Sequence, residues 1–297
     1  MLVKLLISLT LLGGAFGQKN STGGLVVLND SFYLTTVNVI NRANGTGEGY
    51  VLRYSFNGTL LDRVQIGGRA QLPAYHAGGL DTDGTYLYVP LAEYHSGAAC
   101  GAVPNCTLPG TSYIYLVTPD LKEVKLLFTA PDHVGGLTLS GCDTNVIDGN
   151  TWGSRTFYRW SLPDGKLLGK VKNQNYMFEY QDCKALTSCS VQVCSGIKNF
   201  QYQRRRDGLV GDQTVSVVGN STGNIAFQSG GLALVDPVTG IAITQVPVPA
   251  ILTPLGNGLT INPMWVTNSF NGTTGFRFLF APDDVKGSVV VVKPRTP

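Results

Sequence analysis

The chain has 297 residues, of which 43% are hydrophobic and only 14% charged, and its net charge is +3. This balance excludes a disordered or acidic-tail protein, and the weak, dispersed positive charge excludes a basic nucleic-acid-binding face. There are 37 glycines and 15 prolines, and so many breakers exclude long helical bundles and coiled coils. The composition is that of an all-β domain with short elements and many turns.

The N-terminus has the form of a secretory signal peptide. Lys4 gives a positive start, an apolar run follows over 5–13, and Ala15-Phe16-Gly17 fits the small-x-small cleavage rule. The apolar run is too short to span a bilayer. We therefore expect residues 1–17 to be removed, which leaves a secreted protein with one domain over 18–297 and no membrane association.

Two further features are typical of a secreted chain. Seven Asn-x-Ser/Thr sequons predict glycosylated surface positions, at Asn20, Asn29, Asn44, Asn57, Asn105, Asn220 and Asn271. Six cysteines predict disulfides rather than a zinc site, namely Cys100, Cys106, Cys142, Cys183, Cys189 and Cys194. Proximity favours a bridge between Cys100 and Cys106. The three cysteines over 183–194 then compete for one local bridge and one bridge to Cys142.

One pattern recurs five times: a strand, a turn rich in Pro, Asp, Asn or Gly, and a returning strand. It predicts β-hairpins at 49–66, 112–129, 155–172, 230–249 and 276–293. Units of about 40–50 residues, each a small antiparallel sheet, are typical of a β-propeller. Five or six blades fit the chain, and seven would need short blades. The widest interval leaves room for a degenerate unit, to which 214–228 could supply strands.

A second repeat precedes the hairpins. HAGGL at 76–80 and HVGGL at 133–137 share the pattern His-x-Gly-Gly-Leu, and each continues through a turn to a second strand and a polar loop. YQDCK at 180–184 resembles them, with Asp182 near the histidine position. We interpret the three segments as inner strands of successive blades. A pair of β-sandwiches or a β-helix is the alternative, and the period disfavours both.

In a propeller, the start of the inner strand and the loop between strands two and three lie at the same end of a blade. This topology predicts that eight residues meet at one mouth of the central channel: His76, Glu93, Tyr94, His95, His133, Trp152, Arg155 and Asp182. All three histidines of the protein are among them. Such a gathering favours a functional site over a purely structural role, in which the histidines cap backbone groups and the glycines only permit packing.

Three chemistries fit these residue types. A lyase acting on a uronic acid needs an acid, a base and a cation for the carboxylate, and needs no cofactor. Its catalytic candidates are His76, His95, His133, Tyr94 and Arg155, and its substrate-binding candidates are Glu93, Trp152, Tyr180 and Asp182. A lactonase-like hydrolase would instead bind a divalent metal ion, through His76, His133, Glu93 and Asp182. The third is a rim that binds a glycan or protein without turnover. The expected partner is an extracellular polysaccharide or glycan, bound by a monomer.

The segments HAGGLDTDGTYLYVPLAEY, DHVGGL, WGSRTFYRW, YQDC and GGLALVD resemble an uncharacterised family of bacterial and fungal propeller-like proteins over 70–295. That resemblance implies a fold and no activity. A weaker similarity is to propeller polysaccharide lyases acting on ulvan or on rhamnose–glucuronate ends.

In those lyases two histidines, a tyrosine and an arginine lie at the channel mouth, and the histidines and arginine are spaced like His76, His95 and Arg155. The similarity implies acid–base roles for the two histidines and uronate binding by Arg155. The lyase tyrosine is not matched, because Leu139 stands at its expected position. His133 or Tyr94 would have to replace it.

Overall fold

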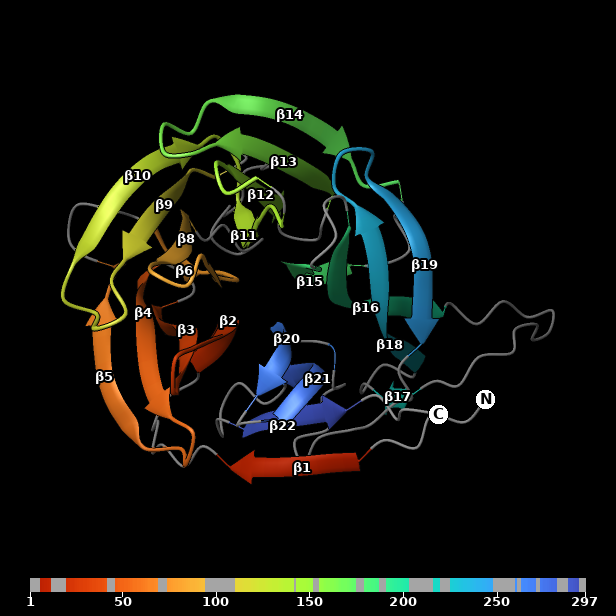
Figure 1. Ribbon diagram of the computed structural model, residues 1–297. Helices are drawn as coiled ribbons and strands as arrows, with labels where there is room; N and C mark the ends of the chain where they lie inside the picture. Colours follow the sequence, from red (N-terminus) through yellow and green to blue (C-terminus); the bar gives the residue numbers. More distant parts are fainter. Residues whose placement is uncertain are drawn as a thin grey trace.

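The computed structural model of the chain describes residues 6–11, 20–41, 46–68, 74–93, 110–141, 143–151, 155–174, 179–186, 191–202, 216–219, 225–247, 260, 263–270, 273–281 and 288–293. These residues form five antiparallel sheets and no helix. The sheets are arranged in a ring around a central axis (Figure 1), so the predicted all-β propeller arrangement is confirmed. Within this part of the chain there is accordingly no helix long and apolar enough to cross a membrane.

The first three sheets follow one plan, in which the chain starts near the axis and moves outward strand by strand (Figure 1). The first sheet contains β2 (Asn20–Leu28), β3 (Ser31–Asn41), β4 (Thr46–Ser55) and β5 (Leu60–Gln65). The second contains β6 (Ala74–Ala77), β7 (Asp81–Thr82), β8 (Leu87–Glu93), β9 (Ser112–Val117) and β10 (Val124–Ala130). The third contains β11 (Val134–Leu139), β12 (Val146–Thr151), β13 (Thr156–Ser161) and β14 (Leu167–Lys172).

The fourth and fifth sheets vary this plan. The fourth contains β15 (Glu179–Ala185), β16 (Gln192–Tyr202), β17 (Ser216–Gly219), β18 (Ile225–Asp236) and β19 (Ile241–Pro247). The fifth contains β20 (Met264–Phe270), β21 (Thr273–Phe280) and β22 (Ser288–Lys293), with β1 (Leu6–Leu11) as its outermost strand. The two ends of the chain therefore meet in one sheet, which closes the ring.

All five predicted hairpins are present, as the pairs β4–β5, β9–β10, β13–β14, β18–β19 and β21–β22. Three of their turns contain a glycine in the left-handed region, with φ of 87° at Gly58, 68° at Gly165 and 70° at Gly240. Glycine adopts this conformation without the steric cost of a Cβ. These turns explain why the sequence signal for the hairpins was strong.

The predicted degenerate unit over 214–228 does not form a sheet of its own. Its described residues contribute β17 and the start of β18, and β17 pairs with β18 inside the fourth sheet. The reason is the length of β18, which has 12 residues. The strand β19 pairs with its second half, from Gly231 to Asp236, and β17 pairs with its first half, from Ile225 to Gln228.

The strand β1 lies within the predicted signal peptide. It pairs antiparallel with β22, with Leu6 opposite Lys293 and Leu11 opposite Ser288. Cleavage after Gly17 would remove this strand and leave β22 as the edge of the fifth sheet. The signal peptide stays a prediction.

Burial decreases from the inside of each sheet to its outer edge. All residues of β12 and all but the last of β8 are buried, whereas β5 is mostly exposed. The apolar side chains of neighbouring sheets pack together, as where Tyr88 of the second sheet joins Val134 and Trp160 of the third. Burial of apolar surface between sheets is the main favourable contribution to the stability of such a ring.

Inner strands approach one another most closely at paired glycines. The Gly79 amide donates to the Gly135 carbonyl at 2.8 Å, and the Leu137 amide donates to the Gly79 carbonyl at 2.9 Å. Gly79 and Gly136 thus form a parallel bridge between the second and third sheets. A Cβ at Gly78 would overlap the backbone carbonyl of Gly135, so these positions have no room for a side chain.

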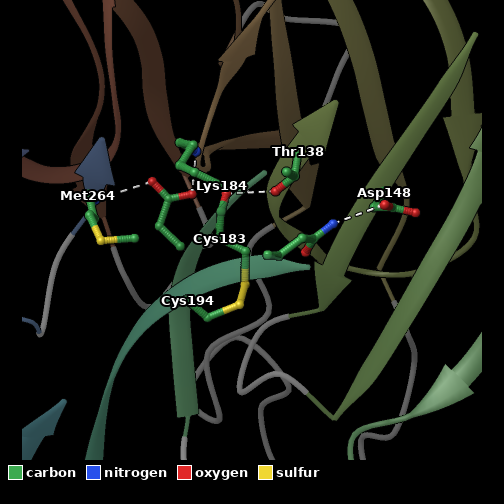
Figure 2. Close-up of a disulfide and its surroundings, with 8 residues drawn as sticks. Thr138, Asp148, Cys183, Lys184, Cys194 and Met264 are labelled. Carbon is green, nitrogen blue, oxygen red and sulfur yellow. Dashed lines mark hydrogen bonds and ion pairs between the residues drawn. A yellow bond between two sulfur atoms is a disulfide. The ribbon is translucent and has the colours of Figure 1, made fainter. Parts of the chain in front are cut away.

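The Cys183–Cys194 disulfide joins β15 to β16, where the two residues stand directly opposite each other (Figure 2). It is one of the local bridges that the sequence left open. Both cysteines are buried, so the bridge lies inside the fourth sheet. Cys100, Cys106, Cys142 and Cys189 lie outside the described residues.

Two of the predicted glycosylation positions are exposed. Asn29 and Asn57 lie in turns between strands, and Asn20 is the first residue of β2. Asn44, Asn105, Asn220 and Asn271 lie outside the described residues. Glycosylation stays a prediction at all seven sequons.

The glycine contact at the axis generates a stability prediction. Gly78→Ala should lower the free energy of unfolding by about 1–3 kcal/mol, as overpacking in a tight interior does. Gly169→Ala is the matched control, because no atom lies within 4 Å of a Cβ built there. Chemical denaturation of both variants measures the effect. Equal stability of the two variants would contradict the steric account.

The observed bridge also predicts the remaining disulfides. Because Cys183 pairs with Cys194, Cys189 is the member of its group left to pair with Cys142. Peptide mapping by mass spectrometry without reduction should therefore find Cys142 linked to Cys189 and Cys100 linked to Cys106. The reduced digest is the control, and alkylation of free thiols in the folded protein would refute the assignment.

Candidate functional site

The parallel bridge at the axis brings two predicted site residues together. Gly79 pairs with Gly136, and His76 and His133 each precede their glycine by three residues. Parallel strands keep a constant register, so the two histidines lie at the same level. The Nδ1 atom of His76 is 3.0 Å from the Nε2 atom of His133, and the ring centroids are 4.8 Å apart.

His76 is the third residue of β6 and stands opposite Ala92 of β8. Its neighbours Tyr75 and Ala77 are buried in the core, whereas the His76 side chain keeps part of its surface exposed. Burial lowers the pKa of His76 to about 4. The ring is therefore neutral at pH 7, in the form that accepts a proton.

His133 lies just before β11 and is only 7% exposed. The turn that contains it is held by the second and third sheets. The Ser112 hydroxyl donates to the Asp132 carbonyl at 2.7 Å and accepts from the Val134 amide at 2.8 Å. The Tyr158 hydroxyl donates to the Asp132 carboxylate at 2.8 Å. These contacts fix the backbone on both sides of His133.

A hydrogen bond between two imidazoles needs one nitrogen to donate and the other to accept, so each ring limits the tautomer of the other. His133 is the more buried and more firmly held of the two. It is therefore suited to orient His76, which keeps part of its surface exposed. This is the arrangement of a base and its orienting partner.

Glu93 is the last residue of β8 and is paired with Ala74 of β6. Its Oε2 atom accepts from the Thr111 amide at 3.1 Å, and its own amide donates to the Thr111 carbonyl at 3.0 Å. Glu93 thus ties together the two chain segments that flank residues 94–109. Tyr94 and His95 directly follow Glu93 and lie outside the described residues.

Arg155 lies at the same end of the third sheet as His133. Val134 is paired with Thr151 across β11 and β12, and the Thr156 amide donates to the Thr151 hydroxyl at 3.2 Å. Arg155 is therefore placed next to that end, and its side chain is exposed. Trp152, the predicted aromatic platform, lies outside the described residues.

Two predicted substrate-binding residues are in the interior instead of at the mouth. Tyr180 is 1% exposed and packs against Phe157 in the core of the fourth sheet. Asp182 is the fourth residue of β15, and a Cβ on Gly79 would lie 2.6 Å from its Oδ1 atom. Asp182 is thus level with Gly79 and Gly136 of the neighbouring strands. Glu179, three residues earlier at the start of β15, is the residue that corresponds to the two histidines.

The Asp182 carboxylate forms a fully buried ion pair with Lys184 at 2.6 Å and accepts from the Met264 amide at 3.3 Å (Figure 2). Burial raises the pKa of Asp182 to about 7, against the opposing effect of the Lys184 charge. Sequence analysis missed this pair. Its signal was present, because an acid and a base two residues apart on a strand point to the same face.

The alternative metal set is not assembled as a group. Within the described residues, no three His, Cys, Asp or Glu side chains are close enough together to hold a metal ion. His76 and His133 contact each other, whereas Asp182 is paired with Lys184 and Glu93 with the Thr111 backbone. Of the four residues predicted for a metal, only the two histidines contact each other.

The chain is similar to solved structures at low sequence identity, and the first of them shares its fold. Glutaminyl cyclase from Myxococcus xanthus is 12% identical, with a TM-score of 0.54, over 98% of this chain and 94% of that one. A gluconolactonase from Xanthomonas campestris is 12% identical, with a TM-score of 0.49, over 99% of this chain and 90% of that one. Likeness at this identity is evidence of the fold alone.

No curated protein matches the chain. A model described as a family of unknown function, DUF6454, matches residues 15–294. This match covers the five sheets apart from β1, and includes the histidine pair and the buried ion pair. The chain therefore belongs to the DUF6454 family.

Proposed function

We propose that the protein is a secreted carbohydrate-active enzyme in which His76, oriented by His133, is the general base at one mouth of the propeller channel. The 3.0 Å contact between the two rings carries the proposal. A general base must be positioned and held in one tautomer, and a hydrogen bond from a firmly held second ring does both.

The reaction we propose is β-elimination at a uronic acid. His76 takes the proton from C5, the C4–O bond breaks as the C4–C5 double bond forms, and an acid protonates the departing oxygen. The C5 proton is acidic only when the neighbouring carboxylate is neutralised. Arg155, exposed at the same end of the third sheet, is suited to that task because a guanidinium binds a carboxylate through two hydrogen bonds.

The identity of the acid rests on the sequence. His95 and Tyr94 directly follow Glu93, whose contacts with Thr111 tie the flanking segments to the channel end. Either side chain could protonate the leaving oxygen. His95 belongs to the set that resembles the propeller lyases, and Tyr94 would replace the lyase tyrosine that this sequence does not match. Under this mechanism no metal takes part, whereas the lactonase-like alternative requires a divalent ion beside the histidine pair.

Secretion and blade number belong to the same proposal. The apolar N-terminus, seven sequons and a disulfide all fit an oxidising, extracellular location. We take each of the five sheets as one blade, which agrees with the lower of the two expected counts.

The pKa of His76 generates a prediction that needs no substrate. With only three histidines in the chain, proton NMR should resolve one imidazole that titrates near pH 4 instead of near its usual 6.5. The unfolded chain binds this proton at higher pH than the folded one. Stability should therefore fall as pH is lowered from 6.5 through 4, by up to about 1.4 kcal/mol per pH unit.

His76→Gln identifies the resonance, which should disappear in this variant, and it should flatten the pH dependence of stability. A titration near 6.5 for all three histidines would contradict the buried, neutral ring.

The activity prediction uses a panel of uronate-containing polysaccharides. Elimination creates a conjugated double bond, so ultraviolet absorbance should rise with one of them. His76→Gln should lower kcat/KM by about 10²–10⁴-fold, the usual contribution of a general base. Arg155→Ala should lower it by about 10–100-fold, the value of a hydrogen bond to a charged group. Arg63→Ala, an exposed arginine on the outer strand β5, is the matched control.

The pH profile separates the mechanisms further. The acidic limb of kcat/KM should follow the deprotonation of His76 and lie well below pH 6.5. A flat absorbance over the whole panel would refute elimination. Acid release from a lactone that is abolished by a chelator would establish the metal-dependent hydrolase instead, and saturable glycan binding without any product would establish a binding module.

A further inference from the structure

A cavity lies at the end of the inner strands opposite the histidine pair. It has a volume of about 330 Å³ and is lined by residues of the second, third, fourth and fifth sheets. The lining residues that matter here are Asp81, Asp83, Ser140, Thr144, Lys184 and Trp265. Its volume lies at the lower end of the range for small-molecule sites, so it has room for a molecule of about one sugar ring.

The cavity is separate from the histidine pair. Asp81 follows His76 by five residues along the same inner edge, which corresponds to roughly 15–17 Å of extended chain. Asp182, fully buried, lies between these levels next to Gly79. A ligand in the cavity therefore does not touch the groups proposed for catalysis.

The floor of the cavity is charged and buried. Lys184 is 2% exposed on its side chain and Asp81 is 5% exposed. The Lys184 ammonium has three hydrogens to donate, and Asp182 is its one hydrogen-bond acceptor within the described part of the chain. A buried ammonium with donors to spare is a strong anchor for an oxygen of a ligand.

Trp265 supplies a second donor and a flat apolar surface. It lines the cavity from β20, and its indole Nε1 is buried with no hydrogen-bond acceptor among the described residues. A buried polar group without a partner costs free energy. A ligand oxygen that accepts from this group would recover that cost, and the indole face would pack against the C–H face of a sugar ring.

The carboxylates of the cavity are held by hydrogen bonds from the second and third sheets. Asp81 accepts from the amides of Thr82 and Leu139, and the Asp83 carboxylate accepts from the Tyr88 hydroxyl at 3.0 Å. Each carboxylate oxygen has a further lone pair for a ligand hydroxyl. The lining therefore offers an ammonium donor and carboxylate acceptors side by side, and a ligand with many hydroxyl groups can use both kinds at once.

We propose that this cavity is a second binding site, distinct from the catalytic one, that takes a single neutral pyranose unit. Its hydroxyl groups accept from Lys184 and Trp265 and donate to Asp81 and Asp83. The exposed residues Asp83 and Thr144 form the entrance, and the buried Lys184 forms the floor. The unit is a free monosaccharide or the end of a longer glycan. This inference does not depend on the proposed reaction.

Isothermal titration calorimetry on the full protein tests the site. The probes are glucose, galactose, mannose and rhamnose, with glucuronate and glucosamine as charged counterparts and methyl glycosides and trisaccharides of the same sugars. One neutral sugar should bind saturably, and its charged counterparts at least tenfold more weakly. Binding of the trisaccharide as well as the monosaccharide assigns the site to glycan ends, and binding of the monosaccharide alone assigns it to free sugars.

Two variants place the binding in this cavity. Thr144→Trp should block the entrance and abolish binding, whereas Thr129→Trp, on the exposed outer strand β10, should not. Trp265→Phe removes the indole donor and should weaken binding at least tenfold, whereas Trp160→Phe, in the core between the second and third sheets, should not.

His76→Gln should leave this binding unchanged, which separates the result from that of the activity assay. The proposal is overturned if no neutral sugar binds, if a charged counterpart binds more tightly, or if binding survives in Thr144→Trp.

Discussion

The direct contact of backbones at the propeller axis is the constraint on which the rest of the structure depends. The hydrogen bonds between Gly79 and the Gly135–Leu137 segment hold two inner strands in parallel register. A Cβ does not fit at these glycines, because it would meet the Gly135 carbonyl at Gly78, the Asp182 carboxylate at Gly79 and the Asn150 side chain at Gly136. The same register, three residues earlier, places His76 against His133. The glycines are therefore structural, and the contact between the histidines is their consequence.

The fourth sheet uses the space that the glycines leave. Where two neighbouring strands have Gly79 and Gly136, β15 has Asp182, whose Oδ1 atom would lie 2.6 and 3.5 Å from Cβ atoms at those positions. A buried carboxylate requires a partner, and Lys184 supplies it from the same face of the strand. The raised pKa of Asp182 records the cost of this burial. The Asp182–Lys184 ion pair thus fills the space beside Gly79 and Gly136.

Sequence patterns predicted the repeated features and missed the exceptions. The hairpins and the His-x-Gly-Gly strands repeat with a local signal, so the ring and the meeting of His76 with His133 followed from topology. The sequence predicted Asp182 at the level of the histidines. In the structure it lies at the level of Gly79, the second glycine of HAGGL. The prediction was wrong because YQDC contains no glycine from which its register could be read. The glycine pair before Leu25 in β2 was missed too, since no histidine precedes it. The Asp182–Lys184 pair had a local signal that was not used, because both residues lie on β15. The cavity, in contrast, arises from several sheets at once, and no local pattern encodes it.

The buried ion pair also separates two levels of the axis. Asp182 has no exposed surface and Lys184 almost none, and Asp182 lies beside Gly79 and Gly136. The histidine pair lies three residues before these glycines, whereas Asp81 and Lys184 line the cavity on the other side of them. The two proposals made above therefore concern different levels of the fold. Their chemistry differs accordingly: a neutral imidazole at one level, and a charged, hydrogen-bonding lining at the other.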